Sequence, residues 1–87
     1  GGYAELVAVD HGAAMRVPSS LTWEEAGALP EVFLTAFLNL FELGAVPDGG
    51  AVLVHGGGSG VGTAAIQLCR EAGIRCIVTA GSEAKLQ

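Results

Sequence analysis

A glycine-dense stretch between two apolar segments is the part of this sequence best suited to bind a ligand. Residues 52–63 read Val-Leu-Val-His-Gly-Gly-Gly-Ser-Gly-Val-Gly-Thr. A strand that turns through glycines into a helix presents unpaired backbone N–H groups at the helix N-terminus, and such groups bind phosphate. This order of residues therefore predicts a phosphate site of the kind that holds a dinucleotide.

The spacing of the glycines departs from the usual Gly-x-Gly-x-x-Gly fingerprint. The pattern that fits is Gly-x-x-Ser-x-x-Gly, which runs from Gly56 through Ser59 to Gly62. In this interpretation Gly56 permits a tight turn and Gly62 lets the helix pack closely on the strand. The Ser59 hydroxyl and Gly60 line the loop between them. A glycine loop by itself is an unspecific signal, and its place between a strand and a helix makes it more specific. The alternative is a loop that only makes a sharp turn.

The choice between NAD and NADP is normally set at the end of the second strand, about 20 residues after the loop. An acidic residue there accepts hydrogen bonds from the ribose 2′-hydroxyl of NAD, but this sequence has Ala80-Gly81-Ser82. Ser82 and Lys85 could instead hold a 2′-phosphate, which favours NADP(H). Glu83 weakens this argument unless it complements the dipole of the following helix, and a solvated Lys85 is the alternative.

The elements that must position these residues follow from hydrophobic periodicity and from breaker residues. From residue 51 on, the pattern predicts a βαβ unit, an α/β fold whose parallel strands need further strands and covering helices. Before it, the sequence predicts two strands and then two helices, the first opened by a Thr22–Glu25 capping box and the second by Pro30. The expected strands are residues 3–9, 14–17, 51–55 and 75–80, and the expected helices are residues 22–29, 30–43, 60–72 and a last helix capped by Ser82.

Composition limits the classes of function. The 87 residues are 51% hydrophobic and 15% charged, more apolar than a small domain needs, which indicates faces that pack on other surfaces. The net charge of −5, with only four Lys and Arg, argues against nucleic-acid binding.

No apolar run is long enough to span a membrane, because Glu31 and Glu42 flank the longest one. With no signal-peptide pattern, we expect a cytoplasmic protein.

Few other side chains in the sequence could do chemistry. Cys69 and Cys76 lack the spacing of a metal or disulfide framework, so both are expected to be ordinary buried thiols. Thr35 and Asn39 lie on one stripe of the predicted helix, where they either face a polar cavity or bond to neighbouring backbone. His55 ends a strand beside the glycine loop, where we expect a bond to backbone and no role in proton transfer.

Four stretches of the chain resemble a known enzyme family. They lie in the family's order and cover nearly the whole chain: residues 1–9, 28–37, 55–68 and 78–87. The run Ser-Gly-Val-Gly-Thr-Ala-Ala-Ile-Gln-Leu that begins at Ser59 is the most specific of them. The sequence resembles the zinc-free quinone oxidoreductases of the medium-chain dehydrogenase/reductase superfamily, and among them the tumour-suppressor-inducible type.

This resemblance implies a partial fold, in which residues 1–30 end a GroES-like catalytic domain and residues 31–87 begin an NADP-binding Rossmann domain. The family's chemistry is hydride transfer from NADPH to a quinone or another electron-poor alkene, without a metal. By the same resemblance, three sets of residues contact the cofactor. They are Ser59, Gly60 and Val61 at the pyrophosphate, Gly81, Ser82 and Lys85 at the adenosine 2′-phosphate, and Thr35 near the nicotinamide.

Full members of this family are several times longer, so the resemblance implies a fragment of such an enzyme. We expect the isolated chain to be inactive and to bind NADPH poorly, and we expect Gly57 and Gly58 to make the loop more flexible than usual. One alternative is a non-enzymatic truncated module that self-associates into a homo-oligomer through uncovered edges and apolar helices. A second alternative is a fragment of an enoyl reductase of fatty-acid or polyketide type, which uses a similar glycine loop.

Overall fold

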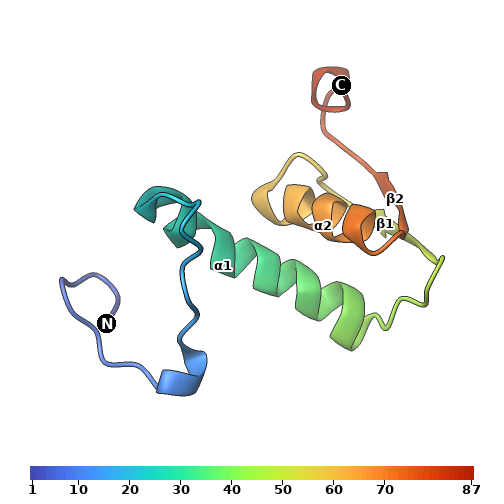
Figure 1. Ribbon diagram of the computed structural model, residues 1–87. Coiled ribbons are helices and arrows are strands. Elements are labelled where there is room, and N and C mark those ends of the chain that lie inside the picture. Colours follow the sequence, from blue (N-terminus) through green and yellow to red (C-terminus); the bar gives the residue numbers. More distant parts are fainter.

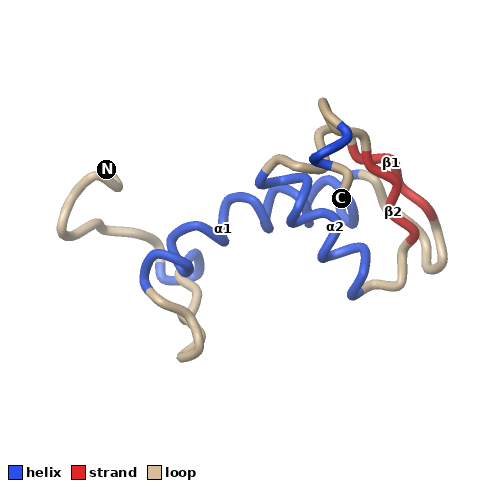
Figure 2. The backbone as a smooth tube through the Cα atoms, turned by 90° about the horizontal axis from the view of Figure 1, so that it is seen from above, coloured by secondary structure: helices blue, strands red, loops and turns tan.

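Two helical segments lie side by side next to a small sheet, and the N-terminal segment extends away from them (Figures 1 and 2). The computed structural model describes residues 1–87. The strands are β1 (Ala51–Val54) and β2 (Arg75–Val78). The helical elements are α1 (Trp23–Phe37), the π-helical turn η2 (Leu38–Leu43) that continues it, α2 (Gly60–Glu71), and the 3-10 turns η1 (His11–Ala13) and η3 (Glu83–Lys85).

The strand, loop, helix, strand order predicted from residue 51 is confirmed. β1 and β2 pair in parallel, with Ala51 opposite Arg75 and Val54 opposite Val78, and α2 forms the crossover between them. The crossover ends where Gly73 adopts φ +67°, a left-handed conformation that glycine takes without strain. Both strands alternate between exposed and half-buried residues, so the helices cover only one face of the sheet.

Small side chains let α1 and α2 approach closely. Ala36 of α1 and both Ala64 and Ala65 of α2 are buried, and inward-facing strand residues pack against the same cluster. The other face of the sheet is bare, with Leu53 57% exposed and Ile77 45% exposed. The apolar composition thus reflects a sheet face that this chain does not cover itself. The buried core consists of Ala36, Leu40, Ala64, Ala65, Cys69 and Ile74.

One continuous helix replaces the two that the sequence predicted between residues 22 and 43. The capping box is confirmed, because the Glu25 N–H donates to Thr22 Oγ1 at 3.2 Å and the Thr22 N–H donates to the Glu25 carboxylate at 2.9 Å. Pro30, however, lies inside α1 and does not open a new helix. An interior proline costs about 3 kcal/mol of helix stability. The helix nevertheless continues through Pro30, which lines an apolar cavity together with Leu29 and Phe33.

The strands predicted over residues 3–9 and 14–17 are wrong. The segment has no paired strand, and its one regular element is η1, where Asp10 Oδ1 accepts the Gly12 N–H at 2.8 Å. A strand needs a neighbour that pairs its backbone groups, and no other strand of this chain lies beside the segment (Figure 2). The side chain of Leu6 is consequently 90% exposed.

The continuous helix Trp23–Leu43 has the length and composition of a membrane-spanning segment, with a mean hydropathy of 1.3. By length and composition, this helix contradicts the expectation that no segment of the chain is long enough to cross a membrane. One such helix is weak evidence for a membrane span, because the core helix of a soluble protein passes the same test. Ala36 and Leu40 are the only buried residues of this helix, and both belong to the core that it shares with α2.

Candidate nucleotide-binding site

The glycine loop is held in a fixed turn by its own backbone and by the end of β2. Gly56 adopts φ +72°, as expected for a tight turn. Its carbonyl accepts the Ser59 N–H at 2.9 Å, and the Gly57 N–H donates to the Thr79 carbonyl at 2.8 Å. The loop is therefore anchored to both strands before α2 begins.

Thr79 contributes to this site although nothing in the sequence predicted a contact from it. Its hydroxyl lies 3.1 Å from His55 Nδ1 and accepts the Gly56 N–H at 3.4 Å, while its N–H donates to the Val54 carbonyl at 3.0 Å. His55 thus pairs with a side chain, and not with the backbone as we expected. The parallel register is the signal that could have identified this pair, because His55 and Thr79 each follow the last paired residue of their strand.

Close contacts, and not flexibility, require two glycines of the loop. A Cβ at Gly62 would overlap the Gly56 carbonyl oxygen and lie 2.8 Å from the Gly57 Cα, so only glycine lets the first turn of α2 pack this closely against the loop backbone. A Cβ at Gly57 would lie 2.6 Å from the Cβ of Val78. The expectation that Gly57 loosens the loop is therefore wrong, since Gly57 is buried against β2.

The first turn of α2 leaves backbone donors free for a ligand. Ser59 caps the helix, and its Oγ accepts the Gly62 N–H at 3.0 Å. The N–H groups of Gly58, Gly60 and Val61 have no acceptor within the chain. Such donors at a helix N-terminus bind phosphate oxygens. The Ser59 hydroxyl keeps its own proton and can donate to the same ligand.

A cavity of about 220 Å³ lies beside this turn. Lys85 supplies the only charge in its lining, which contains no carboxylate. The lysine side chain extends over the loop, because a Cβ at Gly58 would lie 3.7 Å from the Lys85 Cδ. A helix N-terminus and one cation thus meet at a small hollow, an arrangement that suits a phosphate group. The lining residues are Gly56, Gly58, Ser59, Ala80, Gly81 and Lys85.

The cavity brings together the predicted cofactor residues Ser59, Gly81 and Lys85. Ser82 follows Gly81 in the chain but is exposed and lies outside the lining. The helix that Ser82 was expected to cap is only the single turn η3, and the Ser82 side chain makes no capping bond. A contact between Ser82 and a 2′-phosphate stays a prediction.

Val61 and Thr35 do not line this cavity. Val61 lines a separate groove of about 460 Å³ between β1, α2 and the end of the long helix, together with Asn39 and His55. Thr35 is exposed on α1, and its carbonyl accepts the Asn39 side-chain N–H at 2.9 Å. The alternative in which this pair bonds to neighbouring backbone is therefore confirmed for Asn39, and the groove that Asn39 lines is mostly apolar. The predicted contact of Thr35 with the nicotinamide stays a prediction.

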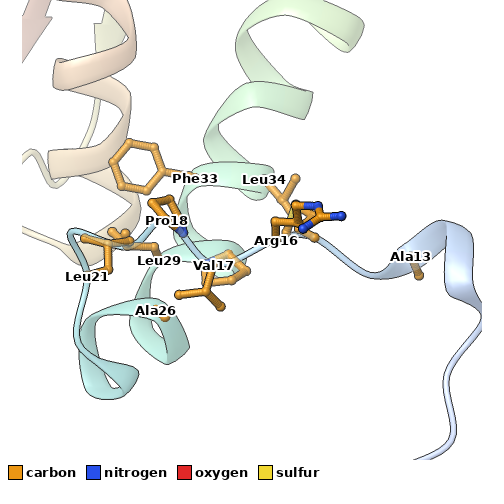
Figure 3. A pocket seen from close by; sticks show the side chains of 11 residues that line it. Ala13, Arg16, Val17, Pro18, Leu21, Ala26, Leu29, Phe33 and Leu34 are labelled. Carbon is orange, nitrogen blue, oxygen red and sulfur yellow. The ribbon is translucent and has the colours of Figure 1, made fainter.

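The largest cavity, of about 520 Å³, is remote from the glycine loop. It lies between residues 13–21 and α1, and Figure 3 shows the side chains that surround it. Arg16 is the only charged residue in its lining. A ligand site usually combines an apolar pocket with several convergent polar groups, which this cavity lacks.

Comparisons with known proteins place this geometry among oxidoreductases. No family model matches the sequence. The highly reducing polyketide synthase apmlA of Arthrinium phaeospermum is 41% identical over 85 residues, which are 98% of this chain and 3% of the synthase. The phenolphthiocerol synthesis polyketide synthase type I Pks15/1 of Mycobacterium bovis is 44% identical over 80 residues, which are 92% of this chain and 4% of that protein.

Two solved structures share the fold. The crystal structure of CurK enoyl reductase matches with a TM-score of 0.76 and 38% identity, over 83% of this chain and 21% of that one. The quinone oxidoreductase from Thermus thermophilus, which was also solved in complex with NADPH, matches with a TM-score of 0.82 and 42% identity. That match covers 98% of this chain and 28% of the oxidoreductase chain.

The chain therefore has an α/β fold that matches part of a quinone oxidoreductase, as predicted. Its sequence and fold fit the medium-chain dehydrogenase/reductase superfamily, since both structural neighbours are oxidoreductases of that type. The quinone oxidoreductase type predicted from the sequence is not singled out, because the sequence relatives are polyketide synthases. The chain spans only a small part of each relative's length.

Proposed function

We propose that this chain is the cofactor-binding part of an NADPH-dependent enoyl reductase of polyketide synthase type. Polyketide synthases match 92 to 98% of its length at 41 to 44% identity, and a solved enoyl reductase matches 83% of its length. This support favours the second alternative from the sequence over the quinone reductase. The fold alone does not separate the two substrates, because a quinone oxidoreductase matches it with a TM-score of 0.82.

The observation that carries the cofactor assignment is the convergence of free donors and a cation. Gly58 and Lys85 line the cavity beside the first turn of α2, where the Gly60 and Val61 N–H groups have no acceptor. We assign the pyrophosphate to these N–H groups and the 2′-phosphate to the Lys85 ammonium. The absence of a carboxylate from the cavity lining favours NADPH over NADH, because a carboxylate there would repel the 2′-phosphate.

The residues of this chain bind and orient the cofactor in this proposal. NADPH, when bound, supplies the hydride that reduces an electron-poor alkene. Thr79 and Gly57 hold the loop against β2, so the donors are fixed before the ligand arrives. Because the chain spans 21 to 28% of the two solved relatives, we propose that turnover needs the remaining parts of such an enzyme and that the isolated chain binds NADPH weakly.

The division into domains belongs to the same proposal. We propose that residues 1–30 end a GroES-like catalytic domain and that residues 31–87 begin a Rossmann domain. The extended N-terminal segment, which lies apart from the sheet, is consistent with that division (Figure 2). Because α1 runs from Trp23 to Phe37, it would join the two domains.

A titration with NADPH and NADH tests the cofactor assignment. Binding of each nucleotide to the purified chain is measured by nicotinamide fluorescence, and we expect NADPH to bind about tenfold more tightly, which is about 1.4 kcal/mol. Lys85→Ala should remove this preference. Arg75→Ala removes the same charge from the exposed start of β2, outside the cavity, and should leave the preference intact. Equal binding of both nucleotides by the unchanged chain would contradict the assignment.

An exchange of segments tests the enoyl reductase assignment. The aligned segment of CurK enoyl reductase, and separately that of the Thermus quinone oxidoreductase, is replaced by this chain. We expect the enoyl reductase hybrid to keep most of its parent's NADPH-dependent reduction of an enoyl thioester. We expect the quinone oxidoreductase hybrid to keep a smaller fraction of its parent's quinone reduction. The opposite ranking would favour the quinone oxidoreductase. A Ser59→Trp change in the first hybrid fills the loop and should abolish its turnover.

A further inference from the structure

The first turn of α2 meets α1 through one methyl group. Val32 of α1 is half-buried and packs against the core. A Cβ at Gly60, the first residue of α2, would lie 3.1 Å from the Cγ1 of Val32. No other atom outside the turn that contains Gly60 lies within 4 Å of that position. Val32 is therefore the side chain that covers the Gly60 backbone from the side of α1.

This contact extends the interface between the two helices to the phosphate-facing turn. Val32 and Ala36 lie four residues apart, on one stripe of α1, and Gly60 and Ala64 share a stripe of α2 in the same way. Ala36 and Ala64 are both buried in the core. The close packing of the helices thus continues from the core to the start of α2.

Two contacts on different sides hold the same turn. On the side of the loop, Gly62 rests on the Gly56 carbonyl, and on the side of α1, Gly60 rests against Val32. The N–H groups of Gly60 and Val61 have no acceptor within the chain. Because no hydrogen bond within the chain orients these two donors, the packing of the turn sets the direction in which they point.

We propose that Val32 is a positioning residue of the phosphate site, which acts through Gly60 and not by contact with the ligand. The inference rests on the proposed function, because that function assigns the Gly60 and Val61 N–H groups to the pyrophosphate of NADPH. Truncation of the Val32 side chain opens a gap beside Gly60, into which the first turn of α2 can move. The two donors then lose their fixed direction, and NADPH binds more weakly.

A double-mutant cycle on NADPH binding tests the proposal. Nicotinamide fluorescence gives the affinity of the unchanged chain, Val32→Ala, Gly60→Ala and the double variant. Val32→Ala opens the gap, and the added methyl group of Gly60→Ala presses on Val32. In the double variant that methyl group fills the gap, since only the Val32 Cγ1 lies within 4 Å of it.

The cycle has a distinct expected result. We expect each single variant to bind NADPH about threefold more weakly, and we expect the double variant to bind about threefold more tightly than the product of the two losses predicts. A direct effect of the methyl group at residue 60 on the ligand occurs in both backgrounds and cancels. Losses that simply multiply would overturn the proposal.

Two further variants separate positioning from stability. Val46 is also half-buried on the core cluster, but it has no atom within 4 Å of the Cβ position at Gly60. Val46→Ala should destabilise the chain as Val32→Ala does, yet leave NADPH affinity within about twofold. Val32→Thr keeps the branched shape and should also keep the affinity, although its hydroxyl lowers stability. An equal loss of affinity in Val46→Ala and Val32→Ala would overturn the proposal.

Nuclear magnetic resonance of the chain without nucleotide distinguishes failure of this inference from failure of the proposed function. If the unchanged chain does not bind NADPH, the proposed function fails. The contact is then tested alone, because Val32→Ala should shift the Gly60 and Val61 amide signals more than Val46→Ala does. If Val32→Ala does not fold, Gly60→Ala replaces it, since its methyl group should shift the Val32 methyl signals. Unchanged signals in the variant that folds would overturn the inference, whatever the NADPH titration shows.

Discussion

The hydrogen atom that serves as the side chain of Gly62 lets the first turn of α2 rest on the backbone of Gly56. A Cβ at Gly62 would overlap the Gly56 carbonyl oxygen. Because a backbone atom cannot move aside as a flexible side chain can, we expect Gly62→Ala to lower the free energy of unfolding by about 1 to 3 kcal/mol. Chemical denaturation followed by circular dichroism measures this loss.

A second glycine provides the matched control for Gly62. Gly27 lies inside α1, where an added Cβ would meet nothing within 4 Å. Gly27→Ala should raise the free energy of unfolding by about 0.5 to 1 kcal/mol, because alanine loses less backbone entropy in a helix. Two alanine substitutions with opposite effects would separate close contact at the loop from the general effect of removing a glycine.

The Ser59 cap gives a second prediction. Ser59 Oγ accepts the Gly62 N–H at 3.0 Å, and we expect Ser59→Ala to lower the free energy of unfolding by about 1 kcal/mol. Ser59→Gly should cost only a few tenths of a kcal/mol. Ser20→Ala changes an exposed serine in a turn and serves as the control. If Ser59→Ala were no more harmful than Ser20→Ala, the cap would have no role in stability.

Thr79 should control how tightly the loop is held. Its hydroxyl meets His55 and accepts the Gly56 N–H, whereas the Gly57 N–H bonds to its carbonyl. Thr79→Val keeps the shape and removes the hydroxyl, so amide hydrogen exchange at Gly56 should accelerate while exchange at Gly57 changes less. Thr79→Ser restores the hydroxyl and should restore slow exchange at Gly56. Equal acceleration at both amides would show a general loosening of the strands.

The bare face of the sheet should make the isolated chain self-associate. Leu53 and Ile77 project from that face and are 57% and 45% exposed, and exposed apolar faces of this kind bind other surfaces. We expect light scattering to give a mass above that of the monomer at high protein concentration, and we expect Leu53→Lys with Ile77→Lys to lower it to the monomer mass. Leu6→Lys, in the extended N-terminal segment, is the control and should leave association unchanged.

The sequence predicted well those elements that residues near in the chain determine. The capping box at Thr22, the turn at Gly73 and the cap at Ser59 depend on bonds within a few residues, and each is present. The loop and both parallel strands follow from the same local signals. The cavity that unites Ser59 with Lys85 was predicted only as a set of contacts, because the distance between these positions depends on the strand pairing.

Features that depend on distant packing could not be predicted from the sequence. The segment from Tyr3 to Val9 has the alternation of a strand, but pairing needs a neighbour that this chain does not provide. Pro30 carries the signal of a helix start, yet in the folded chain the helix continues through it.

Nuclear magnetic resonance of the amide groups during titration with NADPH tests the central claim most directly. The account predicts that the amide signals of Gly58, Gly60 and Val61 shift first and furthest, that they follow one saturation curve, and that NADH at the same concentrations shifts them less. The three donors have no acceptor in the free chain, so a phosphate oxygen should move their signals downfield. Shifts confined to other parts of the chain, or an equal response to NADH, would contradict the account.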